Sequence, residues 1–397
     1  MSKIIAVNAG SSSLKFQLFN MPSEEVITSG LIERIGLDTG IFSITVNGEK
    51  VKKELVIADH TVAVNLVLEA LIEHKILADL SEIEGVGHRV VHGGEYFPKS
   101  VVVDAEVISK VEELSELAPL HNPANLVGYR AFKAALNDVE HVFVFDTAFH
   151  QTMQPEVYLY PLPYEYYTDY KIRRYGFHGT SHFYVSKRVS ELMNKDYSEV
   201  NTIVCHLGNG ASLSAVKGGK VINTSMGFTP LSGIMMGTRT GDVDPAIMPY
   251  LMEKTGLSAQ QVLDIYNKKS GMLGVSGISS DARDVENAAN AGDERAIITR
   301  DLYANRIAQI IGSYFVQLGH VDAIVFTAGL GENDHMIRKA CIDLVSEALK
   351  TKVDEQLNNV RSKEVRISTP DSEVEVWIVP TNEEVVIARD TQELLSK

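Results

Sequence analysis

The chain has 397 residues, of which 45% are apolar and 22% charged, a balance typical of a globular protein long enough for two hydrophobic cores. Its formal net charge of −15 argues against broad nucleic-acid binding, and no run is long and apolar enough for a transmembrane helix or a signal peptide. The two cysteines, Cys205 and Cys341, form neither a disulfide framework nor a metal-ligand cluster, so we expect a cytoplasmic protein with no nucleic-acid or membrane partner.

The first half of the sequence predicts three strands followed by alternating helices and strands. Apolar residues recur at helical spacing between Val64 and Ile72, which predicts an amphipathic helix. Asn47-Gly48 is a typical hairpin turn. We expect strands near 3–7, 14–19 and 25–33, a hairpin at 47–48, helices near 61–76, 109–117 and 123–136, and strands at GVGHRVV and HVFVFD.

The second half alternates in the same way. We expect a helix at 181–193, a strand from 201, a hairpin through Lys217-Gly218-Gly219, a long helix marked by Tyr303 to Leu318, and a strand at DAIVFTAG. Both halves are therefore typical of α/β layers. We place an N-terminal domain at 1–150 plus 385–397 and a C-terminal domain at 151–384.

The region between the halves is rich in tyrosine instead of being a flexible linker. Seven of the 15 tyrosines lie between Tyr158 and Tyr175. An ordered aromatic segment of this kind favours an interface, with packing in the core or at a hinge as the alternative.

The stretch NAGSSSLKFQ follows an apolar strand and leads into another. Gly10 and three serines suit a plain hairpin turn, but small side chains, hydroxyls and Lys15 also suit a phosphate group. TIVCHLGNGASLSAV repeats this pattern, and TAGLGEN is a third glycine-bearing turn between a strand and a helix. Two such turns facing one cleft could hold a polyphosphate between domains, which favours the phosphate interpretation.

Two common nucleotide-binding motifs are absent. The sequence contains neither GxxxxGK[ST] nor GxGxxG, which argues against P-loop and Rossmann sites. What remains is a split α/β fold with phosphate-binding hairpins in each half, as in actin, hexokinase and the heat-shock chaperone ATPases.

Motifs along nearly the whole chain resemble the acetate kinase family. They are, in order, NAGSSSLKFQL, GHRVVHGG, LAPLHNPAN, FDTAFHQTMQP, YGFHGTSH, HLGNGASL, GTRTGDVDP, FTAGLGEN and TNEE. The resemblance implies a duplicated ribonuclease-H-like fold of the actin-like ATPase class, with an active-site cleft between two domains. It also implies reversible, direct in-line transfer of the γ-phosphoryl group of ATP to acetate, giving acetyl phosphate and ADP, in a homodimer that uses Mg²⁺, with Mn²⁺ as an alternative ion.

Other functions fit part of the same pattern. The sister propionate and butyrate kinases share many of these motifs, so they are the alternative within the family. A regulator or chaperone ATPase that hydrolyses ATP without a small acceptor, and a sugar kinase, are the rivals from other classes.

Arg89 and Arg239 are the candidate charge-neutralising residues. A carboxylate acceptor is already an anionic nucleophile, so the enzyme needs charge neutralisation and alignment more than a general base. Guanidinium groups bind carboxylate and phosphate oxygens together. In isolation each arginine would be a surface ion-pair partner, and the family motifs favour the catalytic interpretation.

The resemblance also assigns His178 and Asp146 to catalysis. His178 would be a structural histidine by default, just before Thr180 and Ser181, which could cap a helix. The family motif places it beside the transferring phosphoryl group, where an N–H could stabilise oxygen charge. Asp146 ends a strand, and we expect it to orient Arg89, His178 or metal-bound water and not to act as a base.

The resemblance implies metal and nucleotide residues as well. Asn8 and Glu383 match the Mg²⁺ pair, while Thr381 and Glu384 have capping-box spacing, which leaves Glu383 for the metal. In isolation SDAR would be only a helix cap, and the glycines of GLGEN only turn residues. The implied ATP-binding residues are Ser11, Ser13, Lys15, His206, Leu207, Gly208, Asn209, Gly210, Asp281, Ala282, Arg283, Gly329, Leu330, Gly331, Glu332 and Asn333.

Four apolar residues match the wall around the acyl methyl group in the family. They are Val91, Leu120, Phe177 and Pro230, which join Arg89 as the implied substrate-binding set. Their bulk predicts a preference for acetate over longer acids, with propionate as a weaker substrate.

Overall fold

The structure of the chain, a computed structural model, describes residues 2–397 and forms two compact units. The N-terminal unit consists of the chain up to Ala148 together with Asn382–Lys397, and the C-terminal unit consists of Phe149–Thr381. The N-terminal domain was expected to end at 150 and to resume at 385, which is two and three residues later than in the structure.

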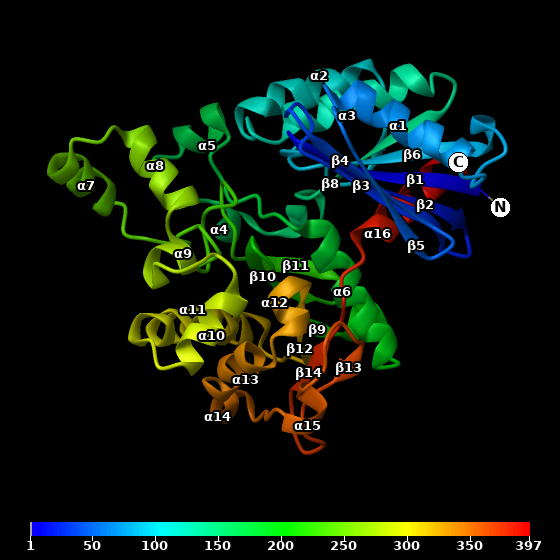
Figure 1. Cartoon of the computed structure of the whole chain (residues 1–397). Coiled ribbons are helices and arrows are strands. Elements are labelled where there is room, and N and C mark those ends of the chain that lie inside the picture. The colour runs from blue at the N-terminus through cyan, green and yellow to red at the C-terminus, as the bar shows by residue number, and fades with distance from the viewer. Residues whose placement is uncertain (1) are drawn as a thin grey trace. The chain divides into compact units, whose positions relative to one another are not determined.

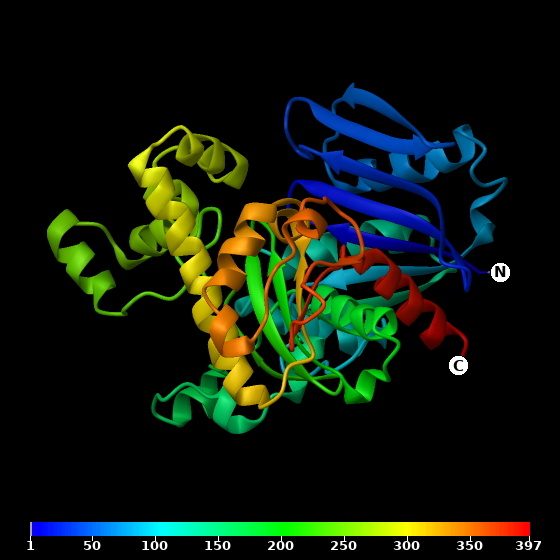
Figure 2. The same cartoon turned by 90° about the horizontal axis from the view of Figure 1, so that it is seen from below.

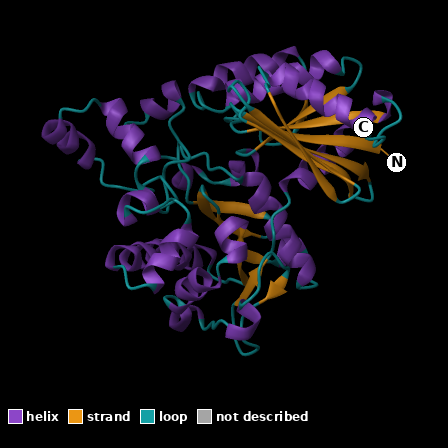
Figure 3. Cartoon of the chain, viewed as in Figure 1, coloured by secondary structure: helices purple, strands orange, loops and turns teal. Residues whose placement is uncertain are grey.

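The N-terminal unit is built on a mixed eight-stranded sheet with the order β5-β4-β3-β2-β1-β6-β8-β7 (Figures 1 and 3). Strands β1 to β5 form an antiparallel meander, and β1, β6 and β8 are parallel. Asn47 and Gly48 both have positive φ, 51° and 85°, as a two-residue hairpin turn requires, which confirms that prediction. The strands are β1 (Ser2–Ala9), β2 (Ser13–Met21), β3 (Glu25–Glu33), β4 (Gly40–Val46), β5 (Glu49–Leu55), β6 (Ile83–Val90), β7 (Val101–Val102) and β8 (Glu140–Phe145).

Helices cover both faces of this sheet. Helices α1 (His60–Glu73), α2 (Ala105–Glu113) and α3 (Asn122–Ala135) lie on one face, and α16 (Glu383–Leu395) lies on the other (Figure 1). A Cβ on Gly87 would lie 2.3 Å from Thr391 Oγ1, and one on Gly85 would lie 2.6 Å from Leu395 Cδ1. The two glycines of GVGHRV therefore let α16 pack closely against β6, which ties the end of the chain to its beginning.

The C-terminal unit repeats the sheet order of the N-terminal unit. Its sheet has the order β11-β10-β9-β12-β14-β13. Three antiparallel strands, β11, β10 and β9, are followed by β12 and β14 parallel to β9, as β3, β2 and β1 are followed by β6 and β8. The duplicated α/β fold predicted from the sequence is thereby confirmed. The strands are β9 (Asn201–Leu207), β10 (Ala211–Lys217), β11 (Lys220–Thr224), β12 (Ala323–Thr327), β13 (Val365–Arg366) and β14 (Glu375–Ile378).

The C-terminal unit contains most of the helices. The long helix α11 packs against α9, α10, α13 and β10 (Figure 2, yellow to orange). It buries Tyr303, Ile307, Ile311 and Leu318 along one face, as the helical spacing predicted. The helices are α4 (Pro155–Tyr158), α5 (Glu165–Tyr170), α6 (Gly179–Leu192), α7 (Ile247–Thr255), α8 (Ala259–Lys268), α9 (Gly271–Ser276), α10 (Ala282–Asn290), α11 (Glu294–Leu318), α12 (Ala328–Asn333), α13 (His335–Asp343), α14 (Ser346–Leu349) and α15 (Glu355–Asn358).

Short 3-10 helices complete the two units. They are η1 (Leu80–Glu82), η2 (Leu114–Glu116), η3 (Ala148–Thr152) and η4 (Tyr197–Glu199). Among residues 2–397, no helix combines the length and apolar character needed to cross a membrane.

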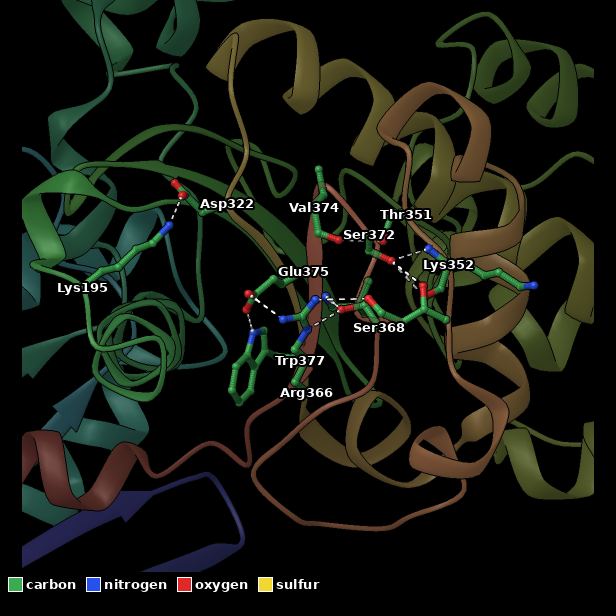
Figure 4. Close-up of polar contacts among 12 residues, drawn as sticks. Lys195, Asp322, Thr351, Lys352, Arg366, Ser368, Ser372, Val374, Glu375 and Trp377 are labelled. Carbon is green, nitrogen blue, oxygen red and sulfur yellow. Dashed lines mark hydrogen bonds and ion pairs between the residues drawn. The ribbon is translucent and has the colours of Figure 1, made fainter.

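Polar contacts hold the edge of the C-terminal sheet, where the chain leaves β14 (Figure 4). Glu375 accepts hydrogen bonds from Arg366 Nη1 at 2.9 Å and from the indole Nε1 of Trp377 at 2.7 Å. Ser368 Oγ accepts from Arg366 Nε at 3.0 Å and from the backbone N–H of Val376, also at 3.0 Å. These bonds hold β13 and the loop after it against β14, from which the chain continues to Thr381.

Candidate active site

The NAGSSS turn is a tight hairpin between β1 and β2. The Gly10 N–H donates to Ser13 O at 2.8 Å, and two side chains hold its backbone from outside. His60 Nε2 donates to Gly10 O at 2.7 Å, and Asn125 Nδ2 donates to Ala9 O at 2.7 Å. The plain-turn interpretation therefore describes the backbone, while Ser11 is exposed and its hydroxyl is accessible to a ligand.

Arg89 and Asp146 lie at the ends of the parallel strands β6 and β8. Arg89 Nε donates to Asp146 Oδ1 at 3.0 Å and Nη2 donates to Oδ2 at 2.5 Å, while Nη1 donates to Asn8 Oδ1 at 3.2 Å. Burial alone lowers the pKa of Arg89, but the charges of Asp146 and Glu383 raise it overall. The guanidinium is therefore firmly cationic, and Asp146 holds it in place, one of the roles expected from the sequence.

The start of α16 brings two carboxylates to the same end of the sheet. The pKa of Glu383 is raised to about 7, mainly by burial and next by the charge of Asp146, while Arg89 opposes the rise. Glu384 forms an ion pair with Lys15. The three carboxylates of Asp146, Glu383 and Glu384 thus form an anionic cluster around one arginine and one lysine.

The capping prediction for α16 was wrong. Asn382 is the N-cap and accepts from Val385 N at 3.1 Å. Thr381 ends the C-terminal unit, and its hydroxyl contacts Ser181 Oγ at 2.7 Å. Asn382 is itself a favoured capping residue, one position later than the Thr-x-x-Glu spacing suggests. Glu384 therefore forms an ion pair with Lys15 and takes no part in a capping box.

Two asparagines in HNPAN, which the sequence analysis did not assign, shape the N-terminal site. Asn125 accepts from Val91 N at 3.1 Å, in addition to its bond to Ala9 O, so it joins the ends of β1 and β6. Asn122 accepts from His92 N and donates to His92 O, both at 3.0 Å. Proline is common in the first turn of a helix, and Pro123 lies there in α3, so the local sequence explains the helix start and gives no sign that the two asparagines bind distant backbone.

In the C-terminal unit, His178 itself is the N-cap of α6. It adopts φ 59°, while Thr180 and Ser181 lie inside the first turn, so the expected capping role of those two residues was wrong. His178 Nδ1 contacts Ser212 Oγ at 2.9 Å, and its ring stacks on that of His206 with centroids 4.2 Å apart. Ser181 is used instead to contact His206 Nδ1 at 2.8 Å.

Arg239 and His178 converge on Gly210. A Cβ on Gly210 would lie 3.4 Å from Arg239 Nη1 and 3.5 Å from His178 Nε2. Arg239 donates to the carbonyl of Pro230 at 3.0 Å, and in the described part of the chain no carboxylate pairs with it. Burial lowers the pKa of Arg239. A partly buried cation with no counter-charge, next to a histidine and a glycine turn, is suited to an anion such as phosphate.

A pocket of about 640 Å³ in the C-terminal unit joins the predicted nucleotide segments. It extends from the β9–β10 turn to the starts of α10 and α12. Eight predicted residues line it: Gly208, Asn209, Asp281, Ala282, Arg283, Gly329, Leu330 and Asn333. Seven others also line it: Gly237, Met272, Ser280, Glu286, Asp334, His335 and Arg361. Gly237 and Ser280 lie in motifs that the sequence already offered, GTRTGDVDP and SDAR, whereas the other five lie outside the recognised motifs, so local sequence gave little signal for those five.

Other residues assigned to the nucleotide lie outside that lining. His206 and Leu207 are buried in β9. Gly331 lies inside α12, and its carbonyl accepts from Arg338 Nη1 at 2.9 Å. Glu332 accepts from Ala328 N at 2.9 Å and from Thr381 N at 3.2 Å, so its carboxylate holds the backbone. TAGLGEN is therefore a short helix directly after β12, and not a turn before one.

The remaining predicted residues belong to both units. Val91 and Phe177 are each 3% exposed, in the N-terminal and C-terminal units respectively, while Leu120 is 75% exposed. Among residues 2–397 no group of three or more His, Cys, Asp or Glu side chains could hold a metal ion. Asn8 and Glu383 supply hard oxygen donors, which suit Mg²⁺ when phosphate and water complete the coordination.

Comparison with known proteins gives one consistent result. The model of the Acetokinase family matches residues 3–389. An acetate kinase of Geobacillus sp. is 58% identical over 394 residues, covering 99% of each chain, and acetate kinase 2 of Listeria monocytogenes is 58% identical over 392 residues, covering 99% of this chain and 98% of that one.

Two solved structures resemble the fold over its full length. The crystal structure of Porphyromonas gingivalis acetate kinase has a TM-score of 0.95 and 47% identity, with 100% of both chains covered. A propionate kinase from Francisella tularensis has a TM-score of 0.94 and 39% identity, covering 99% of this chain and 100% of that one.

Proposed function

Because the chain belongs to the acetokinase family, we propose that it transfers the γ-phosphoryl group of ATP to acetate, reversibly, giving acetyl phosphate and ADP. The observation that carries this proposal is the partly buried Arg239, which has no carboxylate partner among the described residues and converges with His178 on Gly210. The nucleotide pocket, which begins at Gly208 and Asn209 of the same turn, supports ATP as the phosphoryl donor.

Arg89 has the chemistry to bind the acyl substrate. Its guanidinium uses Nε and Nη2 on Asp146 and Nη1 on Asn8. Asp146 therefore fixes the plane of the guanidinium, which neutralises the acetate carboxylate or the acyl phosphate. Acetate needs no deprotonation, so Asp146 acts as a positioning residue and not as a base.

Arg239 and His178 act on the phosphoryl group. Charge builds up on its equatorial oxygens during in-line transfer, and preorganised donors stabilise that charge. Arg239 supplies a cation and His178 a ring N–H on the same side of the β9–β10 turn. Each donor of this type contributes about 3 kcal/mol to lowering the barrier.

Asn8 and Glu383 would hold Mg²⁺ or Mn²⁺. When bound, such an ion would supply positive charge that neutralises the phosphate oxygens of the nucleotide. Asn8 Oδ1 accepts from Arg89, so the same residue aligns the arginine and offers an oxygen to the ion. Ser11 and Ser13 of the hairpin supply hydroxyl donors to the phosphates.

Propionate kinase is the second candidate, favoured by the similarity to the Francisella tularensis enzyme at 39% identity. We propose that the apolar residues Val91, Leu120, Phe177 and Pro230 make acetate the better substrate. An apolar pocket discriminates one methylene by only about 1–3 kcal/mol, so propionate should react more slowly but measurably.

A hydroxylamine trap tests the reaction. An acyl phosphate gives a hydroxamate under mild conditions, whereas a sugar phosphate or free phosphate does not. The protein is incubated with ATP, Mg²⁺ and acetate, propionate or butyrate in turn, with glucose as the matched non-carboxylate acceptor. Hydroxamate formed fastest with acetate supports the proposal. ADP release without hydroxamate from any acid would show an ATPase or a kinase of another class.

We also propose that the chain forms a homodimer through its tyrosine-rich segment. Tyr164 is 63% exposed and Tyr170 62%, whereas Tyr175 is buried and Arg173 stacks over the ring of Tyr158 at 3.7 Å. Part of the segment thus packs internally, and part presents aromatic surface. Light scattering should give twice the mass of 43.7 kDa, and Tyr164→Ser with Tyr170→Ser should weaken the dimer.

A further inference from the structure

Ser212, a fully buried residue of β10, lies between two histidines of the C-terminal unit. Its Oγ is 2.9 Å from His178 Nδ1 and 2.8 Å from His182 Nε2. His178 precedes α6 and His182 lies in its first turn, so the strand hydroxyl joins two positions four residues apart at one helix start. No third contact of Ser212 Oγ is recorded among residues 2–397.

Ser212 has a single hydroxyl proton for these two contacts. A serine hydroxyl donates one hydrogen bond and accepts two, and a neutral imidazole has one N–H and one bare nitrogen. Ser212 can therefore donate to only one of the two rings. The protonation of His182 decides which ring it is.

His182 is buried and neutral. Its side chain has no measurable exposure, and its Nδ1 has no hydrogen-bond partner. Burial lowers the pKa of His182 well below its ordinary value, and the nearby His150 and His206 lower it further. If Nδ1 carried the single proton, a buried N–H would be unsatisfied, which costs more than leaving a weak acceptor unused. The proton therefore lies on Nε2, which donates to Ser212.

The remaining proton directions follow from this one. Since Ser212 accepts from His182, its own proton points at His178 Nδ1, the only other atom in contact. A proton on His178 Nδ1 as well would leave the Ser212 hydroxyl without an acceptor. His178 then carries its N–H on Nε2, the atom that lies 3.5 Å from the Cβ position of Gly210 and on the same side as Arg239.

We propose that Ser212 and His182 are positioning residues which hold His178 as its Nε2–H tautomer, so that it presents a donor to the phosphoryl group. The role of that donor rests on the proposed function, whereas the tautomer itself does not. In the other tautomer, His178 would present a bare nitrogen to an anionic oxygen, which is repulsive. The two buried side chains thus determine that His178 Nε2 carries a proton and acts as a donor.

Histidine nitrogen NMR tests the tautomer directly. Protein labelled with ¹⁵N-histidine is recorded at pH 8, and the signals of His178 are assigned by their loss in His178→Gln. We expect wild-type His178 to be protonated at Nε2. Ser212→Ala should shift it towards a mixture of tautomers. A wild-type His178 protonated at Nδ1, or a spectrum unchanged by Ser212→Ala, would overturn the proposal.

Ser214→Ala is the matched control. Ser214 lies on the same strand, is fully buried, and contacts His150 Nε2 at 3.1 Å and Thr224 Oγ1 at 2.9 Å. The Ser214→Ala variant therefore loses a hydroxyl group from the same strand, but not one that contacts His178. Its His178 signals should match those of the wild type. If Ser214→Ala shifted them as Ser212→Ala does, the effect would be a general loosening of β10 and the proposal would be wrong.

Kinetics provide the functional readout. Ser212→Ala should lower kcat by about tenfold to a hundredfold while KM for ATP changes by less than roughly twofold, because the donor acts mainly in the transition state. His182→Gln keeps an N–H close to the position of Nε2 and should retain more activity than His182→Phe. Equal losses in those two variants would contradict the positioning role. If no hydroxamate forms with any acid although the tautomer is as expected, the proposed function fails and the positioning inference stands.

Discussion

Arg89 and Asp146 form a two-bond pair along one edge of the guanidinium, with Nε–Oδ1 at 3.0 Å and Nη2–Oδ2 at 2.5 Å. Asp146 is 1% exposed, so water does not compete for this contact, and Arg89 Nη1 is directed to Asn8. The pair links strands β6 and β8 and determines which part of the arginine can meet a substrate.

Replacing Arg89 with alanine should therefore lower kcat by about a hundredfold or more, because the carboxylate and the developing charge lose a fixed donor. Arg89→Lys should recover little, since an ammonium cannot make the two-bond contact with Asp146. Steady-state kinetics on folded protein measures both. Arg130→Ala is the control: it breaks an exposed pair with Glu112 and should keep turnover within roughly twofold. Near-normal turnover of Arg89→Ala would remove this arginine from the mechanism.

The NAGSSS hairpin gives a second prediction. Asn8→Ala removes the proposed oxygen ligand of the ion and a partner of Arg89, so it should raise the Mg²⁺ concentration needed for half-maximal rate by about tenfold. Ser13→Ala should lower turnover without that shift. Ser23→Ala, which loses an exposed bond to Asn20 O, is the control. Wild-type Mg²⁺ and ATP dependence in both variants, with lower thermal stability, would show that the loop is only a turn.

Gly237 offers a test of the nucleotide pocket. A Cβ there would lie 2.3 Å from Asn209 Oδ1 and 3.1 Å from Ser280 O. Gly237→Ala must therefore displace the Asn209 side chain, and we expect KM for ATP to rise by about tenfold while KM for acetate stays constant. Gly312→Ala in α11 is matched to it, because nothing lies within 4 Å of its Cβ position. If Gly237→Ala changed only KM for acetate, the pocket would not be the ATP-binding site.

A buried histidine pair gives a pH prediction for the N-terminal unit. His88 Nε2 and His141 Nδ1 are 2.9 Å apart, and both rings are 2% exposed. The pKa of His141 is lowered to about 4, mainly by burial and next by the charge of Lys133. The folded pKa lies below the unfolded value of about 6.5. The stability that depends on neutral His141 is therefore complete above pH 6.5 and is lost as the pH falls from about 6.5 to 4.

His141→Asn should flatten this dependence. An asparagine keeps an acceptor near the position of Nδ1 but takes up no proton. The free energy of unfolding should fall between pH 7.5 and 5 by about 2 kcal/mol less in the variant than in the wild type. Urea unfolding followed by circular dichroism at the two pH values measures this. An identical fall in both proteins would mean that His141 does not titrate on unfolding.

Local residue chemistry was sufficient to predict much of the fold. Asn47-Gly48 has the positive φ values that its hairpin needs, and Tyr303 to Leu318 carry one buried helical face. The repeated strand-turn-strand pattern around Gly10 and Gly210 predicted a duplicated fold, and five successive strands of each sheet follow the same order. Turns, helix faces and strand-turn-strand units are formed by residues close together in the sequence, so their patterns can be read locally.

Contacts between distant segments could not be predicted in this way. The bond from Asn125 to Ala9 spans 116 positions, and the bond from Ser181 to Thr381 spans 200. The glycines of β6 indicate that something packs closely, but not that it is α16. Ser212 appeared in a recognised motif as a small residue after a turn, and only the position of both histidine rings shows its use.

The last prediction concerns acyl size. Val91 follows β6 and is 3% exposed, and its N–H donates to Asn125 Oδ1 at 3.1 Å. The backbone at this position is thus held by α3, so Val91→Ala should enlarge the space beside Arg89 without moving the strand. We expect the acetate-to-propionate ratio of kcat/KM to narrow by about fivefold to tenfold, mainly through a higher KM for acetate, because each methylene contributes about 1–3 kcal/mol.

Val90→Ala is the control, because it removes the same atoms from the neighbouring residue, which packs in the core with Leu126 and Phe143. It should lower stability and leave the ratio unchanged. A wild-type preference for propionate, or a ratio that Val91→Ala and Val90→Ala change equally, would show that Val91 does not wall the acyl group, while the phosphoryl-transfer proposal would still stand on Arg89 and Arg239.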